Sequence, residues 1–157
     1  MPRILEQVIS VSEVSIDAND HVNNREYLRW MEDVAIAHST VQGWPMGRYV
    51  ELGSTWYVRS HYVEYIRPAR AGMAVTALTW VATMEGSSTL RRYAFLCEGR
   101  LLATAETVWV FVDMRTGRPV RVPQDVREAF PLVAADDPGL AVLGAGGTAR
   151  TGRERPA

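Results

Sequence analysis

The chain has 157 residues, a formal net charge of −1 and a hydrophobic content of 47%. These values are typical of one globular domain and give no bulk attraction to nucleic acid or anionic membrane. All 17 basic residues are arginine, and Cys97 is the single cysteine. Schiff-base chemistry, a P-loop lysine, an intrachain disulfide and a cysteine-based metal cluster are therefore excluded.

The N-terminus lacks a basic region followed by a long apolar stretch, so no signal peptide is expected. No window approaches the roughly 20 apolar residues that span a bilayer. We therefore expect a cytoplasmic protein with no membrane span and no nucleic-acid partner.

The first predicted elements are a strand and a long helix. Residues 4–16 mix β-branched and polar residues as a strand does, and residues 17–24 are polar and rich in turn formers. Asn23 is a candidate N-cap, and Glu26 could reach back to complete a capping box. The helix, about 18 residues long, is expected to end near Gly43. Its predicted buried positions recur at helical spacing and are Tyr27, Leu28, Met31, Val34, Ala35, His38 and Val41.

The remainder of the ordered chain is strand-like. Its predicted strands span residues 54–66, 73–84, 88–98 and 101–113, and the short spacers between them favour an antiparallel meander. A last short helix is predicted over 123–130. Glycine, alanine, proline and arginine dominate beyond about residue 134, so we expect one domain over 1–133 and a disordered tail over 134–157.

This order of elements indicates how the chain packs. One helix that is apolar on most faces has to be wrapped by a curved sheet. Such a sheet leaves edges and an outer face to cover, so self-association is expected.

The segment 17–27 (DANDHVNNREY) places a carboxylate, Asp17, just ahead of a helix N-terminus. The first amides of a helix have no internal partner, and the macrodipole puts partial positive charge there. Such amides can polarise a carbonyl and hold the oxyanion of acyl transfer, while a nearby carboxylate acts as general base or nucleophile. The pattern indicates acyl chemistry, although a polar loop ahead of a helix is often no more than a cap.

The pattern Asp-x-x-x-His-Val-Asn-Asn-x-x-Tyr over 17–27 resembles that of acyl-CoA thioesterases of the 4-hydroxybenzoyl-CoA thioesterase superfamily. The branch of long-chain acyl-CoA and acyl-ACP thioesterases is the most similar. The segments 65–72 (YIRPARAG) and 108–123 (VWVFVDMRTGRPVRVP) are similar to that family's Pro-Gly turn and to its last strand and exit. The resemblance covers roughly residues 5–130.

The resemblance implies an α+β hot-dog fold, in which a curved antiparallel sheet of about five strands wraps one long central helix. It implies a homodimer with active sites at the subunit interface, commonly paired into a tetramer, an acyl-CoA or acyl-ACP substrate, and no metal or other cofactor. By position in the motif, Asp17 matches the catalytic carboxylate, and the residues that match the pocket or oxyanion site are His21, Asn23, Asn24, Arg25 and Tyr27.

Several assignments stay open. Asp20 is a second carboxylate in the loop, and Glu32, Asp33 or Glu64 could supply the catalytic carboxylate instead. A hot-dog enoyl hydratase or dehydratase, which pairs aspartate with histidine, and a non-catalytic acyl-CoA-binding protein are the alternative functions.

Further side chains are candidates for contacts with the substrate. The candidates for the phosphates of coenzyme A are Arg67, Arg70, Arg91 and Arg92, because a guanidinium engages phosphate oxygens in pairs. Trp56 and Trp109 could line an acyl tunnel or belong to the core.

Overall fold

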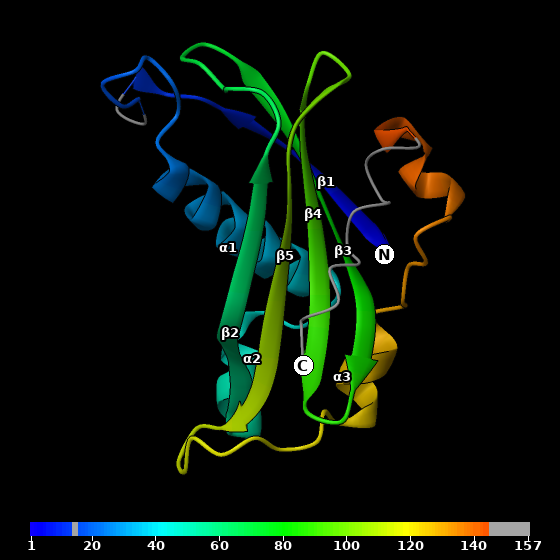
Figure 1. Ribbon diagram of the computed structural model, residues 1–157. Coiled ribbons are helices and arrows are strands. Elements are labelled where there is room, and N and C mark those ends of the chain that lie inside the picture. The colour runs from blue at the N-terminus through cyan, green and yellow to red at the C-terminus, as the bar shows by residue number, and fades with distance from the viewer. Residues whose placement is uncertain (14–15, 145–157) are drawn as a thin grey trace, which may run out of the picture.

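The computed structural model describes residues 1–13 and 16–144 (Figure 1). The elements in chain order are β1 (Ile4–Ser10), α1 (Asn24–Val41), α2 (Met46–Leu52), β2 (Ser54–Tyr65), β3 (Ala74–Glu85), β4 (Ser88–Cys97), β5 (Arg100–Asp113), α3 (Gln124–Ala129) and the 3₁₀ helix η2 (Pro138–Leu143). No helix within the described residues is both long enough and apolar enough to cross a bilayer.

The strands form one antiparallel sheet in the order β1-β3-β4-β5-β2. β3, β4 and β5 form the predicted meander. The expectation that β2 also belongs to it is wrong, because β2 pairs with the far edge of β5 and the link over residues 66–73 crosses to β3. β2 is therefore an edge strand of the sheet.

α1 lies across one face of this sheet (Figure 1). Its buried residues Tyr27, Trp30, Met31, Val34, Ala35 and His38 recur at helical spacing. Alternate strand residues such as Val75, Ala77, Tyr93 and Phe95 pack against them to form the main core. The prediction that Leu28 and Val41 are buried is wrong, because they are 38% and 49% exposed on the helix face turned away from the sheet.

Asn23 caps α1 as predicted, with its side-chain oxygen accepting from the Arg25 amide at 3.0 Å. Glu26 does not complete the expected capping box. Its carboxylate instead forms an ion pair with Arg29, one turn later in the helix, at 2.7 Å. The helix ends as expected before Gly43, which has a positive φ of 90°.

Irregular pairing bends the sheet where it meets the second half of α1. The register shifts between Val58 and Ser60 on β2 and between Val81 and Thr83 on β3. Such bulges increase local twist and bend the strand. α2 and α3 lie at this end of the sheet, whereas the N-terminal end of α1 lies at the other end (Figure 1).

The expectation of disorder from residue 134 is wrong for the segment that holds η2. Leu140 and Leu143 are buried against the sheet face opposite α1, which presents Leu78, Trp80, Ala94 and Leu96. These outward strand residues form a continuous apolar patch that includes a tryptophan and two leucines, so they require cover. Residues 145–157, the remainder of the predicted tail, lie outside the described residues.

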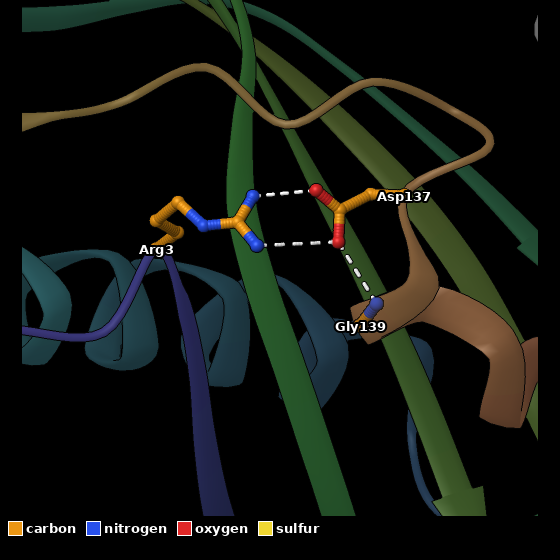
Figure 2. Close-up of polar contacts among 3 residues, drawn as sticks. All are labelled: Arg3, Asp137 and Gly139. Carbon is orange, nitrogen blue, oxygen red and sulfur yellow. Dashed lines mark hydrogen bonds and ion pairs between the residues drawn. The ribbon is translucent and has the colours of Figure 1, made fainter.

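Asp137 fixes η2 in place (Figure 2). Its carboxylate caps the helix by accepting from the Gly139 amide at 2.8 Å and pairs with Arg3 at the start of β1. The hydrogen bond from Arg3 and that from the Gly139 amide lower the pKa of Asp137 below its usual value. The two ends of the described chain are thereby joined.

Candidate active site

The loop ahead of α1 is organised by Asp17. Its Oδ1 accepts from the amides of Asn19, at 2.9 Å, and His21, at 3.3 Å. The Asp17 amide donates to the His21 carbonyl at 2.8 Å, and the Val22 amide donates to Ala69 in the link between β2 and β3. Asp17 is half-buried, and no described residue donates to its Oδ2. Within the described residues, one carboxylate oxygen is therefore held by the loop and the other accepts no hydrogen bond.

Asp20 is placed differently. It has a left-handed backbone with φ of 62°, its side chain is 83% exposed, and Arg70 lies 3.8 Å from its carboxylate. Asp20 thus stands at the tip of the turn in solvent, whereas Asp17 is anchored at the base of the loop next to α1. The geometry favours Asp17 over Asp20 as the reactive carboxylate.

The predicted amide donors at the helix start differ from one another. The Arg25 amide is engaged by the Asn23 side chain, so its expected role as an oxyanion donor is not available in this conformation. The Glu26 amide donates to the Asn23 carbonyl. The Asn24 amide donates to no acceptor among the described residues and is exposed. It is the amide left to polarise a carbonyl.

Tyr27 belongs to the core. Its ring is 2% exposed and makes edge contacts with Trp30, Tyr65 and Phe95 at centroid distances of 4.9, 5.2 and 5.3 Å. Burial raises the pKa of Tyr27 to about 12. The side chain fixes the first turn of α1 against the end of β2 and is a poor proton donor.

The four arginines proposed to contact phosphate separate into two pairs. Arg67 and Arg70 are exposed on the link between β2 and β3, beside the Asp17 loop, and Arg67 donates to the Leu101 carbonyl at 2.8 Å. Arg91 is buried on the sheet face that meets α1, so the expectation that it grips surface phosphates is wrong. Arg92 points to the opposite face, 3.8 Å from Glu106. Arg67 and Arg70 remain the candidates.

A cavity of about 490 Å³ opens between α1, α2 and the bulged end of the sheet. Aromatic and aliphatic side chains make up most of its lining, among them Ile36, Trp44, Tyr49, Trp56, Val81, Trp109 and Phe130. Trp56 and Trp109, the two tryptophans considered for the wall of an acyl tunnel, both line this cavity. Glu32, near the middle of α1 and exposed, is the acidic residue of this lining. A cavity of this size and character suits an apolar ligand group.

The polar side chains of the cavity wall are connected. The Tyr49 hydroxyl contacts Ser39 at 2.8 Å and accepts from the Trp56 indole at 3.2 Å, while Ser39 donates to the Trp44 carbonyl. In the sheet wall of the cavity, Arg91 Nη1 donates to His38 Nδ1 at 2.9 Å and to Thr79 Oγ1 at 3.1 Å. Ser39 fixes the position of α2, and Arg91 places a cation in an apolar wall.

We predicted no role for His38 and no helix at α2. Strand alternation places Arg91 on the same face as Tyr93 and Phe95, so the sequence could have predicted that Arg91 points toward the core. Pro45 and Gly53, which bracket α2, were the available signals for that short helix. No cluster of three or more potential metal ligands occurs in the part of the chain that the structure describes.

Comparison with known proteins adds a family to this geometry. The family model described as "Thioesterase-like superfamily" matches residues 12–130. The L-carnitine dehydrogenase/betainyl-CoA thioesterase of Rhizobium meliloti (strain 1021) is 28% identical over 121 residues, which are 76% of this chain and 24% of that protein. The chloroplastic palmitoyl-acyl carrier protein thioesterase of Cuphea hookeriana is 25% identical over 144 residues, 86% of this chain and 34% of that protein. The chain thus spans about a quarter and about a third of these two relatives.

Among solved structures, the DHNA-CoA thioesterase from Staphylococcus aureus superposes with a TM-score of 0.75 at 20% identity, covering 81% of this chain and 88% of that one. At this identity the likeness shows the fold. The predicted hot-dog fold, an antiparallel sheet against one long helix, is confirmed.

Proposed function

This chain belongs to the thioesterase-like superfamily, and we propose that it hydrolyses an acyl thioester to a free acid and a thiol, with Asp17 as the catalytic carboxylate. The observation that carries the proposal is the position of Asp17, half-buried, held through Oδ1 by two loop amides and adjacent to the N-terminus of α1. The apolar cavity of about 490 Å³ supplies room for the acyl group.

In the proposed reaction the thioester carbonyl lies at the positive end of α1, where the Asn24 amide polarises it. Asp17 Oδ2 accepts a proton from a water molecule as that water attacks the carbonyl carbon. The tetrahedral intermediate collapses, the C–S bond breaks, and the thiolate takes up the proton. Direct attack by Oδ2 on the carbonyl, through a mixed anhydride that water then cleaves, is the nucleophilic form of the same scheme.

The proposed active site is completed by a second copy of the chain. β2 is a 12-residue edge strand with exposed Tyr57, Val58 and Tyr62. Such an edge favours pairing with a copy of itself about a two-fold axis. Antiparallel pairing places the start of one β2, which lines the cavity, beside the end of the other β2.

In each subunit the end of β2 lies close to the Asp17 loop of the same subunit. Tyr65 contacts Tyr27 at 5.2 Å, and Val22 bonds to the link that follows β2. Within one chain, the first cavity residue on α1 is Glu32, eight residues or about 12 Å beyond Asn24. A dimer therefore brings the Asp17 loop of one subunit toward the cavity of the other.

We assign the leaving group to coenzyme A or an acyl-carrier protein. Arg67 and Arg70 are exposed beside the Asp17 loop. Either guanidinium could pair with a phosphate of the thiol carrier without entering the cavity.

The test is a panel of acyl-CoA substrates with detection of free thiol. Asp17→Asn preserves an oxygen for the Asn19 and His21 amides and removes the charge, so we expect kcat to fall by about 10²-fold or more. Asp20→Asn, which keeps a residue that tolerates positive φ, is the matched control and should stay within about threefold of wild type. Full activity in Asp17→Asn would overturn the assignment.

Glu32 is the second carboxylate to test, because it lines the cavity. Glu32→Gln should retain hydrolysis if Asp17 is the catalytic carboxylate. A loss of kcat in Glu32→Gln but not in Asp17→Asn would assign the catalytic role to Glu32 instead. Recording enoyl absorbance in the same assays separates hydration from thiol release.

A further inference from the structure

Arg91 is a buried cation, and no described residue gives it an acidic partner. It is 5% exposed and lines the cavity, and no carboxylate among residues 1–13 and 16–144 forms an ion pair with it. Burying a charge is costly unless it is paired, and buried arginines are ordinarily matched by an acid. Burial lowers the pKa of Arg91, in line with this cost.

The groups that do contact Arg91 leave its charge uncompensated. His38 Nε2 lies 2.8 Å from the Pro2 carbonyl, which can only accept, so Nε2 carries the proton and Nδ1 accepts from Arg91. Burial, and secondarily Arg91, lower the pKa of His38 to about 4, so the imidazole is neutral at physiological pH. Thr79 contributes a neutral hydroxyl.

The remaining surroundings of the guanidinium supply no paired charge: Tyr49 and Tyr93 interact with it electrostatically, and burial raises the pKa of both phenols, so they are neutral. The Phe130 ring lies 5.8 Å from Arg91 Cζ and covers one side. Glu32 is the acidic residue of the lining, but it is exposed and makes no ion pair with Arg91. Both hydrogen bonds that Arg91 forms within the described residues use Nη1, so Nε and Nη2 are left to a ligand.

We propose that the cavity takes an acyl chain whose far end carries a carboxylate, and that Arg91 binds this carboxylate and selects such chains over neutral ones. The proposal rests on the thioester hydrolysis proposed above and names its substrate class. A methyl end would fill the same apolar space and leave Arg91 unpaired. A carboxylate forms charge-assisted hydrogen bonds with the guanidinium where water is excluded. Hydrolysis would then yield a dicarboxylic acid and a free thiol.

The deciding measurement is binding, because it does not depend on turnover. Non-hydrolysable thioethers of coenzyme A that carry an octyl chain, with either a terminal carboxylate or a terminal methyl group, would be titrated calorimetrically into the full chain. We expect the carboxylated analogue to bind wild type at least about tenfold more tightly. Equal affinity, or a preference for the methyl analogue, overturns the proposal whether or not any variant folds.

Variants assign the preference to Arg91. Arg91→Met, a flexible apolar replacement, should reduce the preference to about twofold or less, and Arg91→Lys should keep part of it. Circular dichroism and thermal unfolding check that each variant is folded. If Arg91→Met is folded and retains the wild-type preference, Arg91 is not the anion site.

A parallel activity assay separates the two proposals. Suberoyl-CoA and octanoyl-CoA would be compared by thiol release from wild type. A preference for the carboxylated thioether without any thiol release would leave the ligand assignment intact and refute the hydrolase. Faster release from octanoyl-CoA than from suberoyl-CoA would refute the ligand assignment and leave the hydrolase intact.

Discussion

The two carboxylate oxygens of Asp17 differ in their hydrogen bonds. Oδ1 accepts from two amides, and Oδ2 accepts from no described residue. The residue is therefore structural through one atom and, in the function proposed here, catalytic through the other. Substitutions at this position should separate stability from activity.

We expect Asp17→Ala to destabilise the protein by about 1–3 kcal/mol, because two amides of a half-buried loop lose their acceptor. Asp17→Asn should stay close to wild type in stability, since its amide oxygen replaces Oδ1. Urea unfolding measures both. Equal stability of the two variants would show that the loop does not depend on Oδ1.

His38 should make stability depend on pH. Its folded pKa is lowered to about 4 from 6.5, so between these values the unfolded chain binds a proton that the native protein does not. The free energy of unfolding therefore falls as the pH drops from about 6.5 to about 4, with a slope of up to about 1.4 kcal/mol per pH unit.

His38→Gln is the matched variant for that prediction. Glutamine supplies a donor for the Pro2 carbonyl and an acceptor for Arg91 but does not titrate. Urea unfolding across the pH range should show a shallower slope for His38→Gln than for wild type. The same slope in both proteins would show that His38 is not the titrating group.

At the scale of elements, η2 is attached to the sheet by burial of Leu140 and Leu143 and by Asp137. The pKa of Asp137 is lowered, so its charge stabilises the fold above its usual pKa of 3.8, and this contribution is lost as the pH falls through the lower folded value. We expect Asp137→Asn, which keeps an acceptor for Gly139, to lower Tm at neutral pH.

Measurements at low pH test whether the charge of Asp137 causes this loss of Tm. Thermal unfolding should show the difference between wild type and Asp137→Asn narrowing below pH 3.8, while Asp136→Asn, an exposed neighbour, should match wild type at each pH. A difference that is constant across pH would assign the effect to packing of the side chain instead of its charge.

The strands themselves were largely predictable, with bounds within about two residues for the four that follow α1. Alternation and turn residues act locally, so they report a strand and its faces. They do not report the partner. β2 joins β5 because the β3-β4-β5 meander leaves the far edge of β5 open beside α1, and that choice depends on packing across the whole sheet.

For the whole molecule, the open β2 edge predicts a dimer. Tyr62→Lys places two like charges at the proposed seam, so we expect dissociation toward monomer and loss of thiol release. Sedimentation velocity and the thiol assay measure the two effects. Val8→Lys on β1, the other sheet edge and 62% exposed at this position, is the matched control and should remain dimeric and active. A fully active monomer would refute the shared site.

The sequence by itself determined the long helix, its Asn23 cap, the strand run and the carboxylate-bearing loop at the helix start. Each depends on contacts between near neighbours in the chain, which periodicity and capping chemistry report. Tertiary structure decided that β2 is an edge strand. It also decided that Arg91 is buried beside His38, 53 residues away in the chain. These features depend on which distant segments meet, and that is set by the packing of the sheet against α1.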